Sequence, residues 1–314
     1  MVTLKDIARE CGCDISTVSR ALQNSPRVRQ STIDKVKAAT DKLGYTPNVV
    51  AQTLARGKSF VISFLVPSLV SETENLPAMY ISKFLIPHAY DLVINQYHES
   101  DEMILRQLNR ARQGTADAII IVSSEISLKT FEKHLQNMQL PYIFLDRHCP
   151  GVNATTVTSA NKTAAEELLK LSKKAGADAY VHFFSRDNTA ENERKEGFIS
   201  KVGDSPYIHC QEDLNKFLKE NKVKKLCLFT SVQESAQKFL NDNAELLQDR
   251  EVYAAVFDHW HGPVFPFEKA FLAEQDWESI SEKSVKEILN LIKNKNKKEK
   301  FIKVPFLKIA EVKE

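Results

Sequence analysis

The sequence predicts a small all-α domain with a helix-turn-helix motif, followed by a larger α/β core built on parallel sheets. Two observations predict this division. Within the first 46 residues, apolar side chains recur at helical spacing between residues that cap or end helices. From Phe60 onward, short apolar runs alternate with helix-length segments, which is typical of parallel sheets covered by helices.

The first two helices are predicted from their capping residues. Thr3 is a suitable N-cap, Asp6 complements the dipole of the first turn, and Gly12 can adopt the left-handed conformation that ends a helix. Asp14 can then cap a second helix over Ile15–Leu22. Two short helices joined this tightly form a helix-turn-helix. The side chains assigned to the buried faces are Leu4, Ile7, Ala8, Val18 and Leu22, and those left to face a DNA major groove are Ser16, Thr17, Ser19 and Arg20.

A third helix is predicted from about Thr32 to Leu43, where Gly44 ends it. Pro47 opens a further helical stretch, which Gly57 closes. At under about ten residues, this stretch is too short to be stable alone in water. We therefore expect it to fold only when a partner holds it, and the nearest candidate is DNA.

The body of the chain contains the alternating elements. The strand candidates are Phe60–Val66, Asp91–Ile94, Ala118–Val122, Tyr142–Leu145, Ala154–Thr158, Ala179–Phe184, Leu226–Phe229, Val252–Phe257 and Ile302–Ile309. Helix-length segments between them include Glu102–Arg112, Leu128–Met138, Lys162–Lys174 and Gln233–Leu247. The basic run from Lys293 to Lys300 lies before the last strand, and we interpret it as a solvated loop rather than a second nucleic-acid patch.

Length and composition exclude several classes of protein. The 314 residues allow a small domain plus one large or two medium ones. No apolar run approaches the roughly 20 residues that span a bilayer, and the amino-terminal segment lacks the apolar stretch of a secretory signal peptide. We therefore expect a cytoplasmic protein with no membrane segment. Residues 1–59 carry ten Lys or Arg and five Asp or Glu, whereas the remainder carries 33 basic and 36 acidic residues. The excess of positive charge in residues 1–59 and the slight excess of negative charge in the remainder indicate that contacts with phosphates are confined to the amino-terminal domain.

The five cysteines are odd in number and scattered, which argues against a disulfide framework. Cys11 and Cys13 form a C-x-C pair that lacks further metal ligands. A place in the helix-turn-helix core is the favoured interpretation, and metal binding or redox sensing is the alternative. No metal and no cofactor are expected.

Several amino-terminal segments together resemble the LacI/GalR family of bacterial transcription regulators. These segments are Val2–Ala8, Ser16–Leu22, Leu43–Asn48 and Ala51–Leu54. The alternative, an unrelated three-helix bundle, would not require Arg20, Asn48 and Leu54 at these spacings.

The resemblance implies how this domain meets DNA. Arg20 can bind a guanine through two hydrogen bonds, which discriminates against other bases by roughly 1–3 kcal/mol. Ile15 occupies the family's variable base-contacting position, and Leu54 is expected to insert into the central base step of the minor groove and bend the duplex, with simple packing as the alternative. The implied DNA contacts are Ile15, Ser16, Thr17, Arg20, Arg27, Arg29, Tyr45, Asn48, Ala51 and Leu54.

The body is similar to the family's two-lobed sensor core, which is shared with periplasmic sugar-binding proteins. Each lobe is then a doubly wound parallel sheet. The implied domains are residues 1–46 for the helix-turn-helix domain, 47–58 for a hinge helix and 59–314 for the core. Lobe 1 is expected at about 59–157 and 276–296, and lobe 2 at about 158–272 and 300–314. The chain is expected to cross between lobes near Val157–Ala160, Phe271–Gln275 and Asn296–Phe301.

Open α/β sheets bind ligands beyond the carboxyl ends of their strands, so the expected effector cleft lies between the lobes. Asp146-Arg147 follows a predicted strand, Arg194-x-x-Gly197-Phe198 matches a motif whose arginine clamps the effector in the family, and Asp258 ends another strand. Charged and amide side chains of this kind suit a sugar, a small acid or a nucleoside. The implied effector contacts are Asp146, Arg147, Asn161, Arg194, Asp258 and Gln275.

The core also departs from the family pattern. Val232-Gln233 stands where the family has Asn-Asp, and Ala160 replaces an acidic residue. Pro77 and Pro87 interrupt the first helix of the core, which we expect to be shortened, kinked or rebuilt, because a proline inside a helix costs about 3 kcal/mol. A common monosaccharide is therefore not the expected effector. Either the ligand differs, or the cleft has lost ligand control.

These features together predict a sequence-specific transcriptional regulator, a repressor, that is not an enzyme. We expect it to bind a pseudo-palindromic operator in double-stranded DNA as a homodimer. The two copies are expected to meet mainly through their first lobes. A dimer is expected rather than a tetramer because no heptad helix follows the last strand. The alternatives are the same regulator without a small-molecule effector, or a non-catalytic binding protein. The sequence contains no phosphate loop, G-x-S-x-G or zinc spacing, and His259 beside Asp258 is interpreted as a ligand contact.

Overall fold

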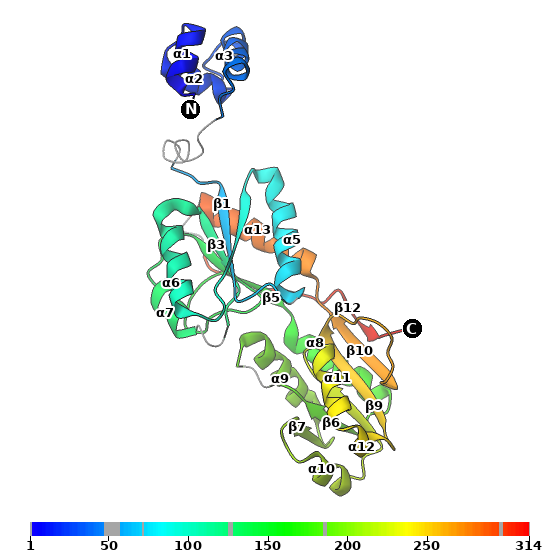
Figure 1. The fold of residues 1–314 in the computed structure, drawn as a ribbon. Helices are drawn as coiled ribbons and strands as arrows, with labels where there is room; N and C mark the ends of the chain where they lie inside the picture. Colours follow the sequence, from blue (N-terminus) through cyan, green and yellow to red (C-terminus); the bar gives the residue numbers. More distant parts are fainter. Residues whose placement is uncertain are drawn as a thin grey trace. The chain divides into compact units, whose positions relative to one another are not determined.

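The structure is a computed structural model that describes residues 2–46, 57–70, 72–124, 128–184, 187–294 and 298–313. The chain divides into two compact units, Met1–Lys58 and Ser59–Glu314 (Figure 1). Residues 47–56 of the predicted hinge stretch, with Asn48, Ala51 and Leu54, lie outside the described residues.

The first unit contains the three predicted helices, α1 (Leu4–Cys11), α2 (Ile15–Leu22) and α3 (Gln30–Leu43). The hydroxyl of Thr3 donates to the Asp6 carboxylate at 2.7 Å, and the backbone N–H of Thr3 donates to it at 2.9 Å. Gly12 and Gly44 end α1 and α3 with φ of 60° and 63°, in the left-handed region that favours glycine. The helices bury a shared apolar core that includes Ile7, Val18, Ile33 and Val36.

The second unit begins with a six-stranded parallel sheet. Its strands, in spatial order, are β11 (Phe301–Val304), β5 (Thr156–Ser159), β4 (Tyr142–Leu145), β3 (Ala118–Ile121), β1 (Val61–Val66) and β2 (Asp91–Gln96). One face packs against α5 (Glu72–Leu85) and α13 (Trp277–Lys293), and the other against α6 (Asp101–Arg110) and α7 (Leu128–Leu135) (Figure 1). We call this layered body lobe 1.

Lobe 2 repeats the same three-layer architecture. Its strands, in spatial order, are β12 (Lys308–Glu311), β10 (Lys269–Glu274), β9 (Glu251–Asp258), β8 (Lys225–Phe229), β6 (Ala179–His182) and β7 (Tyr207–His209). All pairs are parallel except β10 with β12. Helices α8 (Asn161–Lys174) and α9 (Thr189–Val202) cover one face. The other face is covered by α10 (Leu214–Glu220), α11 (Gln233–Asp242) and α12 (Ala244–Leu247).

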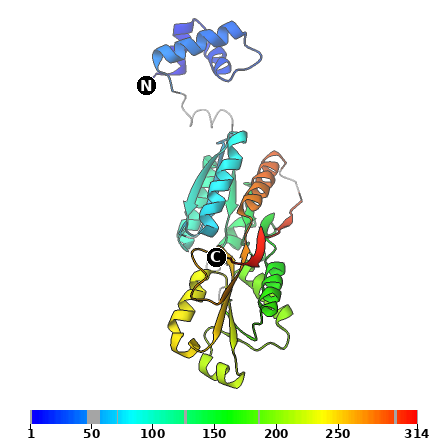
Figure 2. The same ribbon diagram turned by 90° about the vertical axis from the view of Figure 1, so that its right-hand side faces the viewer.

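The chain passes between the two sheets at three neighbouring places (Figure 2). The first crossing is at Ala160, whose N–H donates to the carbonyl of Val304 at 2.8 Å, and the second follows Glu274. The third crossing lies between Val304 of β11 and Lys308 of β12, where the N–H of Leu307 donates to the carbonyl of Glu274 at 2.8 Å. The crossings are therefore joined to one another by backbone hydrogen bonds.

This topology corrects three expectations. The third crossing lies at residues 305–307, not near Asn296–Phe301, so β11 belongs to lobe 1. The predicted strand Ile302–Ile309 is two strands in different sheets, because Pro305 has no N–H for a ladder. Strand β10 was expected only as a crossing, and β7 is a three-residue edge strand, too short for its pattern to stand out in the sequence.

Helix α5 is more regular than its prolines predict. It runs unbroken over 14 residues with Pro77 buried inside it, and Pro87 lies in the short 3-10 turn Ile86–His88 that follows. Pro77 removes one helical hydrogen bond, and burial of its ring offsets part of that cost. Within the described chain, no helix has both the length and the apolar character to cross a membrane.

Candidate functional site

Helix α2 presents a polar outer face above a buried inner one. Asp14 accepts a hydrogen bond from the backbone N–H of Ser16 at 2.8 Å, which fixes the start of the helix. Val18 and Ala21 are fully buried, whereas Ser16 and Arg20 are exposed. Thr17 is half-buried, and Ile15 is 40% exposed. Hydroxyl, guanidinium and apolar groups thus lie along one accessible helix, which suits contact with base edges.

The other predicted DNA contacts in this unit differ in exposure. Arg27 and Arg29 are exposed, and Arg29 precedes α3 as its N-cap residue. Tyr45 is half-buried and packs against the helical core. Among the described residues, Arg20, Arg27 and Arg29 form no ion pair with a carboxylate, so their charges are available to an external anion.

The cysteine pair is part of the helical core. Cys11 is 1% exposed, and its Sγ lies 3.7 Å from the carbonyl oxygen of Lys35. Burial raises the pKa of the Cys11 thiol, which disfavours the thiolate that metals and oxidants need. Cys13 is half-buried and packs against the same core. No group of His, Cys, Asp or Glu with metal-holding geometry occurs in the part of the chain that the structure describes.

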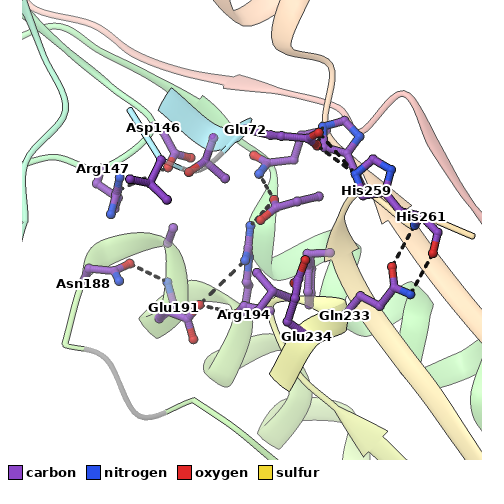
Figure 3. Close-up of a pocket in the computed structure, with 18 residues that line it drawn as sticks. Glu72, Asp146, Arg147, Asn188, Glu191, Arg194, Gln233, Glu234, His259 and His261 are labelled. Carbon is purple, nitrogen blue, oxygen red and sulfur yellow. Dashed lines mark hydrogen bonds and ion pairs between the residues drawn. The ribbon is translucent and has the colours of Figure 1, made fainter. Parts of the chain in front are cut away.

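A cavity of about 460 Å³ lies between the two lobes (Figure 3). Residues that follow strands β4, β8 and β9 and residues of α9 form its walls. The described residues that line it are Val70, Glu72, Thr73, Asp146, Arg147, Asn188, Ala190, Glu191, Arg194, Ser231, Val232, Gln233, Glu234, Phe257, Asp258, His259, His261 and Gln275. The predicted contacts Asp146, Arg147, Arg194, Asp258 and Gln275 thus all reach one cavity.

The lobe 1 wall is built around Asp146 and Arg147. Asp146 follows β4 with φ of 61°, and its carboxylate is 8% exposed. The guanidinium of Arg147 pairs with Glu74 of α5, while its Nε lies 3.6 Å from the Asp146 carboxylate. Burial by itself would lower the pKa of Arg147, but Glu74 and Asp146 together raise it above its ordinary value.

The lobe 2 wall is built around Arg194. Its Nε donates to Asn161 at 2.9 Å, and its terminal nitrogens lie 3.4 Å from Asp258 and 3.8 Å from Glu191. The guanidinium also lies over the ring of Phe257, 4.2 Å from the centroid. Asn161, expected among the effector contacts, is fully buried and stands behind Arg194 rather than in the cavity wall. Asn161 therefore positions the arginine.

Gly197 and Phe198, the last two residues of the Arg-x-x-Gly-Phe motif, pack α9 against the rest of lobe 2. A Cβ at Gly197 would lie 2.3 Å from the carbonyl oxygen of Lys162, so only glycine lets α9 approach α8 this closely. Phe198 is fully buried among aromatic rings of lobe 2. Both residues serve packing, and they hold Arg194 against the sheet.

Gln275 links the cavity to the crossings. Its amide nitrogen donates to Asp258, and its amide oxygen accepts from the hydroxyl of Ser159 at 2.5 Å. Gln275 lies at the second crossing, and Ser159 immediately precedes the first. The hydrogen bonds of the Asp258 carboxylate therefore extend into two of the connections between lobes.

The cavity mouth contains residues that sequence reasoning missed. Glu72 of lobe 1 lies 3.4 Å from His259 and 3.2 Å from His261 of lobe 2, and Gln233 holds the backbone of His261 at 2.8 Å (Figure 3). Glu191 was also missed, although its position three residues before Arg194 places both on one face of a helix. No spacing in the sequence relates Glu72 to His261, because the two residues lie far apart in the chain and come into contact only in the folded protein.

Burial dominates the electrostatics of Asp146. It raises the pKa of Asp146 to about 6, against the lowering effects of Arg147 and Arg194. Asp258 and Glu74 add to the rise because they are like charges.

Comparisons with known proteins agree with this architecture. Residues 3–48 match the family described as "Bacterial regulatory proteins, lacI family". The chain is 28% identical over 206 residues to the probable HTH-type transcriptional repressor ExuR of Bacillus subtilis, covering 64% of this chain and 60% of that protein. It is 27% identical over 223 residues to the sucrose operon repressor of Streptococcus mutans, covering 70% of this chain and 68% of the relative.

The fold is that of a solved regulator. The lac repressor dimer bound to operator and the anti-inducer ONPF superimposes with a TM-score of 0.79 at 18% identity, over 99% of this chain and 98% of that one. The chain thus joins an amino-terminal domain, which matches the lacI family of bacterial regulatory proteins, to a core with the lac repressor fold.

Proposed function

We propose that this protein is a bacterial transcriptional repressor that binds a pseudo-palindromic operator as a dimer and responds to a small molecule in its interlobe cavity. The observation that carries the proposal is the exposed polar face of α2 within a domain that matches the lacI family. Relatives along much of the chain are named as repressors, among them ExuR and the sucrose operon repressor. A protein with this role acts in the bacterial cytoplasm, where the DNA is.

The proposed division of labour on DNA follows from exposure and chemistry. Ser16, Thr17 and Arg20 would contact base edges, and Ile15 would meet a thymine methyl group. Arg27 and Arg29 are exposed, and their guanidinium groups would contact phosphates, which position the protein without selecting sequence. Tyr45, Asn48, Ala51 and Leu54 remain proposed contacts through the resemblance to the family, with Leu54 as a wedge in the minor groove.

A dimer surface is proposed on lobe 1. Helix α5 and the edge strand β2 pack against each other, and both expose apolar side chains. Met79 is 54% exposed on α5, Ile86 is 72% exposed just after it, and Val93 is 45% exposed on β2. An exposed sheet edge beside apolar side chains favours a symmetric contact with a second copy. The lac repressor, whose fold this chain shares, is a dimer on its operator.

The cavity supports a small-molecule effector. Its volume of about 460 Å³ fits a ligand of the size of a sugar or nucleoside. Proteins of similar fold have been solved with cellobiose and with fructose 1-phosphate. Val232 favours the second candidate, a regulator without an effector, because it places an apolar side chain in the cavity wall at the N-cap of α11. The buried carboxylate of Asp146 favours a ligand.

The test is selection of DNA from a random library with the full chain at moderate ionic strength. Enrichment of an inverted repeat is expected, and Arg20→Ala should abolish that preference. Lys219→Ala, an exposed lysine of α10 in lobe 2, is the control for loss of one positive charge and should select the same sequence. A library that shows no enriched sequence with the unaltered chain would refute the proposal.

A further inference from the structure

The cavity between the lobes carries an excess of negative charge. Five of the described residues that line it are acidic, namely Glu72, Asp146, Glu191, Glu234 and Asp258. Two are permanently basic, Arg147 and Arg194. Glu74, which pairs with Arg147, adds a further carboxylate behind the wall. Asp146, Glu191 and Asp258 are buried, and buried carboxylates are costly unless a positive charge compensates them.

Both guanidinium groups are already matched with carboxylates of the protein. Arg147 pairs with Glu74 and lies 3.6 Å from Asp146. Arg194 lies between Asp258 and Glu191 and donates to Asn161. An anionic ligand would therefore have to displace these internal partners and would leave buried carboxylates without a counter-charge.

Asp146 is a buried acceptor of the wall without a donor, and the nitrogens Arg147 Nε and His259 Nε2 of the same wall are also buried without a hydrogen-bond partner among the described residues. The Asp146 side chain is 8% exposed, and its Oδ1 is buried without a hydrogen-bond partner among the described residues. Its Oδ2 is 3.6 Å from Arg147 Nε, beyond hydrogen-bond distance. A buried carboxylate oxygen that lines a cavity and receives no donor from the protein is a ready acceptor for a ligand N–H group.

The opposite wall presents a second aspartate in the equivalent place. Strands β4 and β9 occupy the same position in the order of their two sheets, and Asp146 and Asp258 each stand at the carboxyl end with positive φ, 61° and 70°. The two carboxylates are close enough for Asp258 to raise the pKa of Asp146. A positive charge between them would stabilise both.

We propose that the cavity binds a small ligand through a protonated amine, which donates to Asp146 and compensates the carboxylates of both lobes. This inference rests on the proposed function, since it names the chemical class of the effector of that same cavity. The amine would sit between the walls seen in Figure 3, with Asp146 on the lobe 1 side and the α9 residues Glu191 and Arg194 facing it. Ligands whose only charge is a phosphate or a carboxylate are disfavoured by the same wall.

The test compares ligands that share a skeleton and differ in charge. One series is D-glucosamine, D-glucose and D-glucose 6-phosphate, and the other is putrescine, butane-1,4-diol and succinate. Each compound is titrated into the full chain at neutral pH and constant ionic strength, and the unfolding temperature is recorded, because a ligand that binds the folded state raises it. In at least one series the amine should raise the unfolding temperature and its neutral and anionic counterparts should raise it less.

Variants identify the carboxylate involved. Asp146→Asn should raise the dissociation constant of the responding amine by about tenfold or more, because it removes one charge-assisted hydrogen bond. Glu220→Gln removes one negative charge at the exposed end of α10 and should leave that constant unchanged. An amine that binds the Asp146→Asn protein as tightly as the unaltered one would overturn the assignment.

The inference is also overturned if neither amine stabilises the protein, or if a neutral or anionic counterpart stabilises it at least as much. Operator selection by the same preparation separates this failure from failure of the proposed function. A protein that selects an inverted repeat but does not prefer amines remains a regulator with a different effector. One that selects no DNA contradicts the proposed function itself.

Discussion

Replacing Gly197 with alanine tests whether the close approach of α8 and α9 holds the cavity in shape. Gly197 is buried within α9, and its backbone lies against α8. A Cβ there would lie 2.3 Å from the carbonyl oxygen of Lys162 and 2.8 Å from the Cβ of Ala165. Ordinary contacts of a Cβ begin at 3.4 Å, so the helices must separate by about 1 Å.

The expected magnitude follows from two opposing contributions. Overpacking a buried contact typically costs about 1–3 kcal/mol, and here the obstructing atom belongs to a backbone rather than to a flexible side chain. Because the obstructing backbone atom cannot move aside, the cost lies at the upper end of this range, about 2–3 kcal/mol. Alanine has a higher helix propensity than glycine, and this difference offsets up to about 1 kcal/mol of the overpacking cost. The net loss in the free energy of unfolding is then about 1–2 kcal/mol. For a core of this size, that loss lowers the unfolding temperature by about 2–8 °C.

Urea denaturation and thermal unfolding of the full chain measure this loss. Lys195→Ala, on the exposed face of the same helix, is the matched control and should change the unfolding temperature little. Separating the helices also moves Arg194 relative to Asn161, so binding in the cavity should weaken together with stability. A Gly197→Ala protein as stable as the unaltered one would contradict the close packing of α9 against α8.

Three other perturbations give direct expectations. Arg20→Ala should remove about 1–3 kcal/mol of discrimination at one position of each half-site while the oligomeric state stays unchanged, as seen in binding titrations with single-base operator variants; equal discrimination would contradict the role of α2. Glu74→Gln should destabilise the core by about 3–5 kcal/mol in urea denaturation, because it leaves the Arg147 guanidinium buried without its main counter-charge; a loss below about 1 kcal/mol would show that solvent reaches this pair. The folded-state pKa of Asp146, about 6, lies above its ordinary value of 3.8, so the folded protein holds this proton more tightly than the unfolded chain does. Its contribution to stability should therefore be fully present below about pH 4 and be lost as pH rises through about 6. Asp146→Asn should flatten that part of the stability profile, and an identical profile in the variant would exclude Asp146 as its source.

The amino-terminal domain could be predicted almost completely because its signals are local. Thr3, Asp14 and Gly12 mark helix ends through their own backbone and side-chain chemistry, and the structure has the helices at those ends. Helix α3 begins two residues before the predicted start, where the sequence offers no strong capping residue.

The core shows where sequence reasoning ends. Most strands were found because parallel strands buried on both faces are continuous apolar runs. The predicted strand Ile302–Ile309 is two strands that belong to different sheets. Pro305 marks a break in the pattern, but the sequence does not indicate which sheet each half joins. Five of the six predicted cavity residues line the cavity. Four of them stand at or just after strand ends, which the fold fixes, and Arg194 lies on α9. The pairing of Glu74 with Arg147 joins α5 to a residue that follows β4, and no spacing in the sequence encodes it.

The hydrogen-bonded connections between the lobes restrict how the two bodies can move. The three crossing segments are joined by backbone hydrogen bonds at Ala160 and Leu307. Together they resist sliding and stretching more than they resist bending, so they act as a hinge between the lobes. Gln275 lies in one of these crossings and also donates to Asp258. A displacement of the Asp258 carboxylate would therefore be passed by hydrogen bonds to the segments that must bend when one lobe rotates against the other.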